Sequence, residues 1–180
     1  FIAINDNYDS ADENAAVNGI IVPFKNLIND AYCRDISIKI RSHLEIKRKR
    51  GEFIGAFPVY GYARGENRNK LIVDPYASGI VKEIFQMKLD GMSQQHIADE
   101  LNSLGILSPA EYKKEIGSGY RAVFQTHSKA KWTAMAVLRI LTNEVYVGTL
   151  IQGRESTPNY KVKIRQKKPQ AEWTRVENVH

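Results

Sequence analysis

Cysteine is almost absent from this chain: Cys33 is the only one among 180 residues. A single thiol excludes an internal disulfide framework and favours a reducing compartment. Neither Cys33 nor the histidines stand at the spacings that metal ligands require; the histidines are His43, His96, His127 and His180. The sequence therefore predicts no metal site and no cofactor within these residues.

Long apolar runs are absent too. No stretch approaches the roughly 20 apolar residues that a membrane-spanning helix needs, and we expect no membrane partner. The first ten residues, FIAINDNYDS, lack the charged and apolar regions of a secretory signal peptide. They are typical of a strand over residues 1–4 followed by a polar loop over residues 5–19. Because a lone strand has no pairing partner, we expect the chain to begin partway through a larger domain.

Catalytic motifs are missing as well. The sequence contains no Gly-rich phosphate loop, no HExxH, no paired cysteines and no nucleophile elbow. The acidic residues are scattered apart from one cluster in the first loop, where solvated charge is favoured over a metal site; its members are Asp6, Asp9, Asp12 and Glu13. We therefore expect the chain to bind rather than catalyse, and we assign no catalytic residue.

Charge is unevenly distributed along the chain. The formal net charge is +6, yet residues 1–30 hold five acidic residues against Lys25 alone, which gives 1 − 5 = −4. Residues 31–180 therefore carry +6 + 4 = +10. This asymmetry favours a nucleic-acid partner, although basic segments also bind acidic membranes.

The densest positive charge ends a long helical pattern. Apolar residues recur near helical spacing over residues 24–50, with Pro23 suited to the first turn and Gly51 to the stop. The stripe is too long for one small domain, so we expect this helix to bridge two domains or to pack against another helix. It closes on four successive cations, Lys47, Arg48, Lys49 and Arg50.

After these cations the chain becomes the extended segment GEFIGAFPVYGY, residues 51–62. Cations on phosphates release counterions, and an extended segment with apolar wedges suits a minor groove. The alternative is that the four cations complement the helix dipole and remain solvated. Phe57 is a candidate groove contact, while at least two of the four nearby aromatic residues belong to the core; the four are Phe53, Phe57, Tyr60 and Tyr62.

Shorter elements follow, each bounded by turn or cap residues. We expect strands at 60–63 and 71–73 around the turn GENRN, and a helix capped by Asp74 that ends near Gly91. The remaining expectations are a helix capped by Ser93, a short helix at 109–115, an irregular loop at 116–131, a helix opened by Trp132 and Thr133, a strand at 145–152 and a linker-like polar stretch from 157.

Two of these segments, GMSQQHIADELNSLGI and WTAMAVLRIL, have helix-turn-helix character. The small residue Ala98 permits close helix approach, although an insertion over residues 106–131 replaces the usual short turn. In such motifs the second helix enters the major groove. We expect Val137, Leu138 and Leu141 to face inward on this helix; the outward residues are then Thr133, Ala134, Ala136, Arg139 and Thr142.

Arg139 suits a bidentate contact to guanine or a phosphate contact, and Thr133 can hydrogen-bond either. Lys129 and Lys131, just upstream, favour phosphate contact. The alternative is an ordinary amphipathic helix with a solvated arginine. Two further arginines complete the candidate DNA-binding set, namely Arg64 and Arg154. Together the elements predict a mainly α fold with small β elements (α+β), in which a long helix precedes a winged-helix-like or helix-turn-helix DNA-binding domain.

The order of these features resembles the large serine recombinases, which include serine integrases and the transposases of conjugative elements. The matching segments are FIAINDNYDS, NLINDAYCRDISIKIRS, GEFIGAFPVYGY, LIVDPYASGIVKEIF, GMSQQHIADELNSLGILSP and W-x4-V-x2-IL-x-N-x2-Y-x-G from Trp132 to Gly148. The resemblance implies the end of a resolvase-type catalytic domain at 1–23, a linking and dimerisation helix at 24–50 and a recombinase DNA-binding domain at 51–155. It also implies a basic linker at 156–180 toward a zinc-ribbon domain, where zinc is expected.

The parent reaction that this resemblance implies is strand exchange through a phosphoserine link, for integration or excision of a mobile element in the bacterial or phage-infected cytoplasm. No position here matches the catalytic serine, so we expect this piece to be inactive alone. Ser37 and Lys39 match the family's S-x-K pattern, which implies support of the active site or of the dimer seam in a dimer or tetramer. The alternatives are a stand-alone winged-helix transcriptional regulator and a protein-interaction module.

Overall fold

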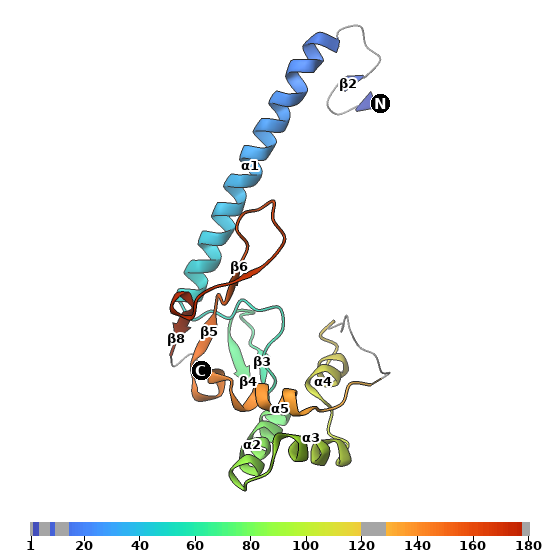
Figure 1. Ribbon diagram of the computed structural model, residues 1–180, viewed down its shortest axis with the longest axis vertical. Coiled ribbons are helices and arrows are strands. Elements are labelled where there is room, and N and C mark those ends of the chain that lie inside the picture. Colours follow the sequence, from blue (N-terminus) through green and yellow to red (C-terminus); the bar gives the residue numbers. More distant parts are fainter. Residues whose placement is uncertain (1, 4–7, 10–14, 120–128, 178–180) are drawn as a thin grey trace. The chain divides into compact units, whose positions relative to one another are not determined.

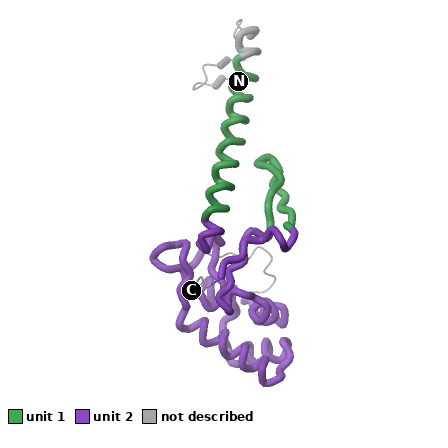
Figure 2. Tube along the Cα trace, turned by 90° about the vertical axis from the view of Figure 1, so that its left-hand side faces the viewer, with its two compact units in different colours: residues 1–46, 155–168 green, residues 47–154, 169–180 purple. Residues whose placement is uncertain are grey.

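The computed structural model describes the backbone of residues 2–3, 8–9, 15–119 and 129–177, and the side chains of residues 21–119 and 129–177 (Figure 1). The chain divides into two compact units (Figure 2). Unit 1 comprises residues 1–46 and 155–168, and unit 2 comprises residues 47–154 and 169–180. Helices predominate among the described residues, and all the strands lie in two-stranded antiparallel sheets. The predicted α+β class agrees with this composition.

Unit 1 is built on α1 (Ala15–Lys49), whose last residues belong to unit 2. The helix begins earlier than the sequence predicted, so part of the expected loop is helical and Pro23 lies inside the helix rather than in its first turn. Alanine is the best helix former, and the Ala-Ala-Val start favours a helix despite the nearby Asn-Gly pair. None of the described helices, α1 included, is long and apolar enough to cross a membrane.

Two small sheets complete unit 1. The strand β1 (Ile2–Ala3) pairs antiparallel with β2 (Tyr8–Asp9), so the expectation of a strand without a partner was wrong. Strand β6 (Glu155–Ser156) pairs antiparallel with β7 (Gln166–Lys167). The side chains of the acidic cluster at residues 6–13 lie outside the described part of the chain.

Unit 2 contains a helical core. Helices α2 (Pro75–Leu89), α3 (Gln94–Ser103) and α5 (Ala134–Leu141) pack together, and the short α4 (Pro109–Glu115) adds to them. The predicted helix starts are confirmed, because the caps are Asp74, Ser93, Ser108 and Thr133 and each side chain accepts a backbone N–H. The fully buried side chains of this core include Ile84, Ile97, Ala98, Leu101 and Val137.

Unit 2 also contains a second hydrophobic core, to which residues of its strands contribute. The hairpin of β3 (Tyr62–Arg64) and β4 (Leu71–Val73) is confirmed, and β5 (Leu150–Gln152) pairs antiparallel with β8 (Thr174–Val176). The buried residues of this core are Phe53, Leu71, Val145 and Leu150. Phe53 and Tyr60 are both buried, which confirms that at least two of the four aromatic residues are core.

The predicted strand at 145–152 was wrong in its first half. A 3-10 helix, η2 (Glu144–Val147), occupies that part, and only residues 150–152 are strand. The Asn143 side chain accepts from Val145 N, and Gly148 ends the turn at φ +89°, a backbone conformation that favours glycine. The segment after residue 156, predicted as a linker, contains β7, the 3-10 helix η3 (Gln170–Glu172) and β8.

Candidate nucleic-acid interface

Helices α3 and α5 are brought together across the long insertion by one asparagine. The Asn102 Oδ1 accepts from Trp132 N at 2.9 Å, and its Nδ2 donates to Trp132 O at 3.1 Å. Trp132 is buried, and its Nε1 donates to Ile106 O at 3.0 Å. These bonds join the end of α3 to the residue that precedes the Thr133 cap. The start of α5 is therefore fixed even though a 26-residue insertion, residues 106–131, separates the helices, part of which lies outside the described residues.

The outer face of α5 carries the predicted recognition residues Thr133 and Arg139, and both are exposed. Two expectations on this helix were wrong: Leu138 is 38% exposed rather than inward, and Ala136 packs against the core. The helix phase is set by Val137 and Ile140, which are buried against the other helices. Thr142 is exposed as expected, and Ala134 is half-buried.

The segment just before α5 alternates between inward and outward residues. Ala130 N donates to Glu111 Oε1 at 2.8 Å, and Ala130 O accepts from Ser108 Oγ at 2.9 Å. Ala130 and the buried Trp132 are thereby held inward, whereas Lys129 and Lys131 are exposed beside them. Two cations are thus presented next to the N-terminus of α5.

The four cations at the end of α1 differ in their exposure to solvent. Lys47 and Arg48 are half-buried, whereas Lys49 and Arg50 are exposed. Lys47 Nζ lies 4.0 Å from Glu52 Oε2, a weak ion pair. Lys49 and Arg50 are therefore the members best placed to meet a polyanion.

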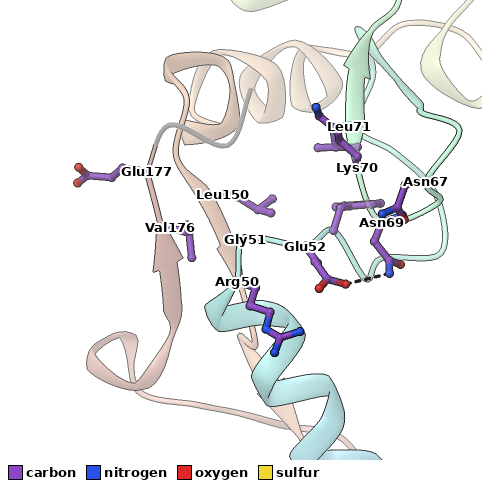
Figure 3. Close-up of a pocket in the computed structure, with 11 residues that line it drawn as sticks. Arg50, Gly51, Glu52, Asn67, Asn69, Lys70, Leu71, Leu150, Val176 and Glu177 are labelled. Atoms are coloured by element: carbon purple, nitrogen blue, oxygen red, sulfur yellow. Dashed lines mark hydrogen bonds between the residues drawn. The ribbon is translucent and has the colours of Figure 1, made fainter.

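An open hollow of about 440 Å³ lies beside Arg50 (Figure 3). Its apolar floor is formed by residues of the second core, and its rim is polar and charged; it is lined by Arg50, Gly51, Glu52, Phe53, Asn67, Asn69, Lys70, Leu71, Leu150, Val176 and Glu177. Asn69 Nδ2 donates to Glu52 Oε2 at 2.9 Å across the rim. Arg50, Lys70 and the two asparagines supply hydrogen-bond donors of the kind that contact phosphate oxygens.

Asn67, Asn69 and Lys70 were not predicted as site residues. The signal that indicated them was the turn sequence GENRNK between the two strands, in which amides and cations gather at one loop. This stretch was predicted only as a turn. Its position beside Arg50 becomes evident once β3 and β4 pair.

The extended segment that follows α1 is fixed by bonds to other elements. Phe53 N donates to Asn69 O at 2.7 Å and Ile54 N to Gln152 Oε1 at 3.0 Å, while Gln152 Nε2 donates to Glu52 O at 2.8 Å. Arg64 is half-buried, with Nη2 donating to Gly55 O at 2.5 Å and to Ala56 O at 2.7 Å. Its guanidinium, predicted as a DNA contact, is thus engaged by the segment itself.

Phe57 lines a second hollow of about 260 Å³, which is mostly apolar. Lys113 Nζ lies 5.6 Å from the Phe57 ring centroid, and burial lowers the pKa of Lys113. The other predicted arginine, Arg154, is exposed with its guanidinium 5.0 Å from the Trp173 ring centroid.

The two residues of the S-x-K pattern lie on α1. Ser37 Oγ accepts from Arg41 Nη2 at 3.0 Å, and Lys39 pairs with Asp35 at 2.7 Å. Among the described residues, no three His, Cys, Asp or Glu side chains gather as metal ligands would. All the predicted DNA-binding residues, by contrast, belong to unit 2, since they lie between residues 47 and 154.

No solved protein structure matches the chain. The family described as Recombinase matches residues 75–180, more than half of the chain, from the start of α2 through β8. This match agrees with the resemblance to serine recombinases. The chain therefore belongs to the Recombinase family.

Proposed function

We propose that this chain binds duplex DNA on behalf of a site-specific serine recombinase and directs strand exchange to a chosen sequence. The observation that carries the proposal is the exposure of Thr133 and Arg139 at the start and on the outer face of α5, in a chain of the Recombinase family. A helix of this kind, packed against a partner helix with its outer face unburied, suits a major groove.

The outer face of α5 has the composition of a base-reading surface. Met135, Leu138, Arg139 and Thr142 recur at spacings of three or four residues and are all exposed. Arg139 suits guanine or a phosphate, and the apolar side chains suit thymine methyl groups. Met135 was absent from the sequence prediction and Leu138 was predicted to face inward; both are exposed and complete this face.

Phosphate contacts are assigned to cations that precede this helix in sequence. Lys49 and Arg50 are exposed at the end of α1, and Lys129 and Lys131 are exposed just before α5. Such contacts fix register on the duplex and supply affinity for any sequence, while base contacts supply preference. The extended segment, anchored by Gln152 and Arg64, is the part that we assign to the minor groove.

We propose that strand exchange proceeds through a serine outside this chain, in a dimer or tetramer that pairs through α1, and that a further domain binds zinc. We expect the recombinase to act in the cytoplasm, where bacterial or phage DNA is accessible. The Recombinase match does not favour the alternative of a stand-alone transcriptional regulator.

The test compares Arg139→Ala with Lys49→Ala on two duplexes, one selected by the protein from a random pool and one of unrelated sequence. Arg139→Ala should weaken binding to the selected duplex by about 1–3 kcal/mol and relax preference at one base pair. Lys49→Ala should weaken binding to both duplexes alike. Lys82→Ala, an exposed lysine on α2, is the matched control.

Salt dependence gives the second readout. Binding through six or more phosphates should lose roughly a thousandfold in affinity between about 50 and 200 mM salt. Equal effects of Arg139→Ala on both duplexes would refute the assignment of α5. An affinity that is indifferent to salt would refute duplex DNA as the partner.

A further inference from the structure

The segment between β5 and β8 carries a concentration of positive charge that the proposed function does not use. It is the β6–β7 hairpin and its loop, residues 155–168, in which Glu155 is the only acidic residue. Its cations are Lys161, Lys163, Arg165, Lys167 and Lys168. The hairpin belongs to unit 1, whereas every DNA-binding residue predicted above belongs to unit 2.

Four of these cations recur at every second position. Residues 162–165 run without a turn into β7 (Gln166–Lys167). The four cations at alternate positions are all exposed, namely Lys161, Lys163, Arg165 and Lys167. We call the four cations the basic row.

The start of the basic row is attached to α1. Tyr160 OH donates to Asp30 Oδ1 at 2.5 Å, and Lys161 Nζ lies 2.7 Å from the same oxygen. The Asn159 Oδ1 accepts from Lys161 N at 2.9 Å and from Val162 N at 3.0 Å, which shapes the turn before the row. Within unit 1, Asp30 of α1 therefore contacts the hairpin loop at Tyr160 and Lys161.

Not every member of the row is equally available. Asp30 offsets the charge of Lys161, and Arg165 lies 3.8 Å from Glu155, at the edge of an ion pair. An exposed pair of this kind contributes little. The three cations available to bind an external polyanion are therefore Lys163, Arg165 and Lys167.

We propose that the basic row is a second phosphate-binding surface of this protein, and that it binds the backbone of duplex DNA without reading sequence. This inference rests on the proposed function. Duplex DNA carries one charge per roughly 1.7 Å of axis, so phosphates are dense enough along the duplex to meet each exposed cation of such a segment.

An acidic protein or an anionic membrane would be attracted by the same cations, but DNA is favoured by position in the chain. The row lies inside the part that matches the Recombinase family and is inserted between β5 and β8, two paired strands of the unit that holds the candidate interface. The attachment to α1 restricts the motion of the row before binding, which lowers the entropy lost when a ligand is bound.

The test replaces the three available cations by glutamine in the full chain, as Lys163→Gln, Arg165→Gln and Lys167→Gln together. Fluorescence anisotropy on a duplex of random sequence, repeated at several salt concentrations, gives the slope of log affinity against log salt. The slope should fall by up to about 2.7, because each lost phosphate contact removes about 0.9. A charge-preserving variant, Lys163→Arg with Arg165→Lys and Lys167→Arg, should keep the wild-type slope. A matched control removes three exposed cations of unit 2, Lys82, Lys88 and Lys114, and should change the slope less.

Two further measurements test the inference without the triple variant, so they do not depend on whether that variant folds. On the wild-type chain, duplex DNA should protect Lys163 and Lys167 from acetylation, read by mass spectrometry, and leave Lys82 and Lys88 reactive. Tyr160→Phe removes the hydroxyl bond to Asp30 and keeps all the charges, so it should weaken binding two- to threefold with an unchanged slope.

The possible results separate a failure of this inference from a failure of the proposed function. If the wild-type chain binds duplex DNA with the expected salt dependence while the triple variant keeps its slope and lysine protection is absent, the row does not bind DNA and serves another partner or none. If the wild-type chain itself binds no duplex, the proposed function fails first, and this inference fails with it. Tyr160→Phe binding as the wild type does would refute a role for the attachment to α1.

Discussion

Replacement of Gln152 by methionine tests how the extended segment is held. The Gln152 amide accepts from Ile54 N at 3.0 Å and donates to Glu52 O at 2.8 Å, and these partners lie 98 and 100 positions away along the chain. Methionine has a similar length and cannot replace either bond. Each hydrogen bond contributes about 0.5–1.5 kcal/mol net, and a partly buried backbone group left without its partner adds to the loss. We therefore expect Gln152→Met to lower the free energy of unfolding of unit 2 by about 1.5–3 kcal/mol.

The assay is urea unfolding followed by tryptophan fluorescence. Both tryptophans of the chain, Trp132 and Trp173, lie in unit 2, so their emission reports this unit. The control is Gln86→Met, because the Gln86 amide lies on the exposed side of α2 and donates to Asp90 Oδ1 at 2.9 Å, four positions away at the end of the same helix. A surface change of this kind should alter the free energy of unfolding by no more than about 0.5 kcal/mol.

The refuting result is equality of the two variants. If Gln152→Met destabilises no more than Gln86→Met, the segment is held by its other bonds, and Gln152 has no positioning role. The intermediate variant Gln152→Glu keeps an acceptor for Ile54 N and loses the donor to Glu52 O, so its stability should fall between those of the wild type and Gln152→Met. Affinity for a random duplex should follow the same order if the segment lies in a minor groove.

Two other predictions concern the helical core. Asn102→Ala removes both bonds to the Trp132 backbone and should cost about 1–3 kcal/mol in urea unfolding, with a larger loss of affinity for the selected duplex than for the random one; equal losses would argue against a role in placing α5. The other prediction concerns alkaline pH, because burial and the hydrogen bond to Asp74 raise the pKa of Tyr112 from 10 to about 12. The neutral phenol therefore stabilises the folded state fully below pH 10, and this contribution is lost as the pH rises to about 12. Tyr112→Phe should remove that part of the dependence of stability on pH, and an unchanged alkaline profile would contradict the assignment.

The features that the sequence predicted correctly are those set by neighbouring residues. Asp74 and Ser93 were identified as helix caps from their own side chains and the residues that follow, and each accepts a backbone N–H within three positions. The turn between β3 and β4 was likewise readable from GENRN. Such signals act within one turn of chain, so the sequence alone suffices.

The wrong predictions share a different origin. Val145 and Val147 are β-branched and suggested a strand, but the Asn143 side chain and the left-handed Gly148 close a 3-10 turn there. The inward face of α5 was misplaced because Leu138 has the same hydrophobicity as Leu141, and only packing against the other helices decides which is buried. Choices of that kind depend on residues that are distant in sequence.

The candidate interface depends on two such distant contacts. Asn102 reaches 30 positions to hold the residue before the α5 cap, and Gln152 reaches about 100 positions to hold the segment after α1. Both use a side-chain amide, which can donate to and accept from one stretch of backbone at once. The positions of α5 and of the extended segment therefore depend on side chains outside the basic segments, and for this reason the composition of the basic segments alone does not locate the interface.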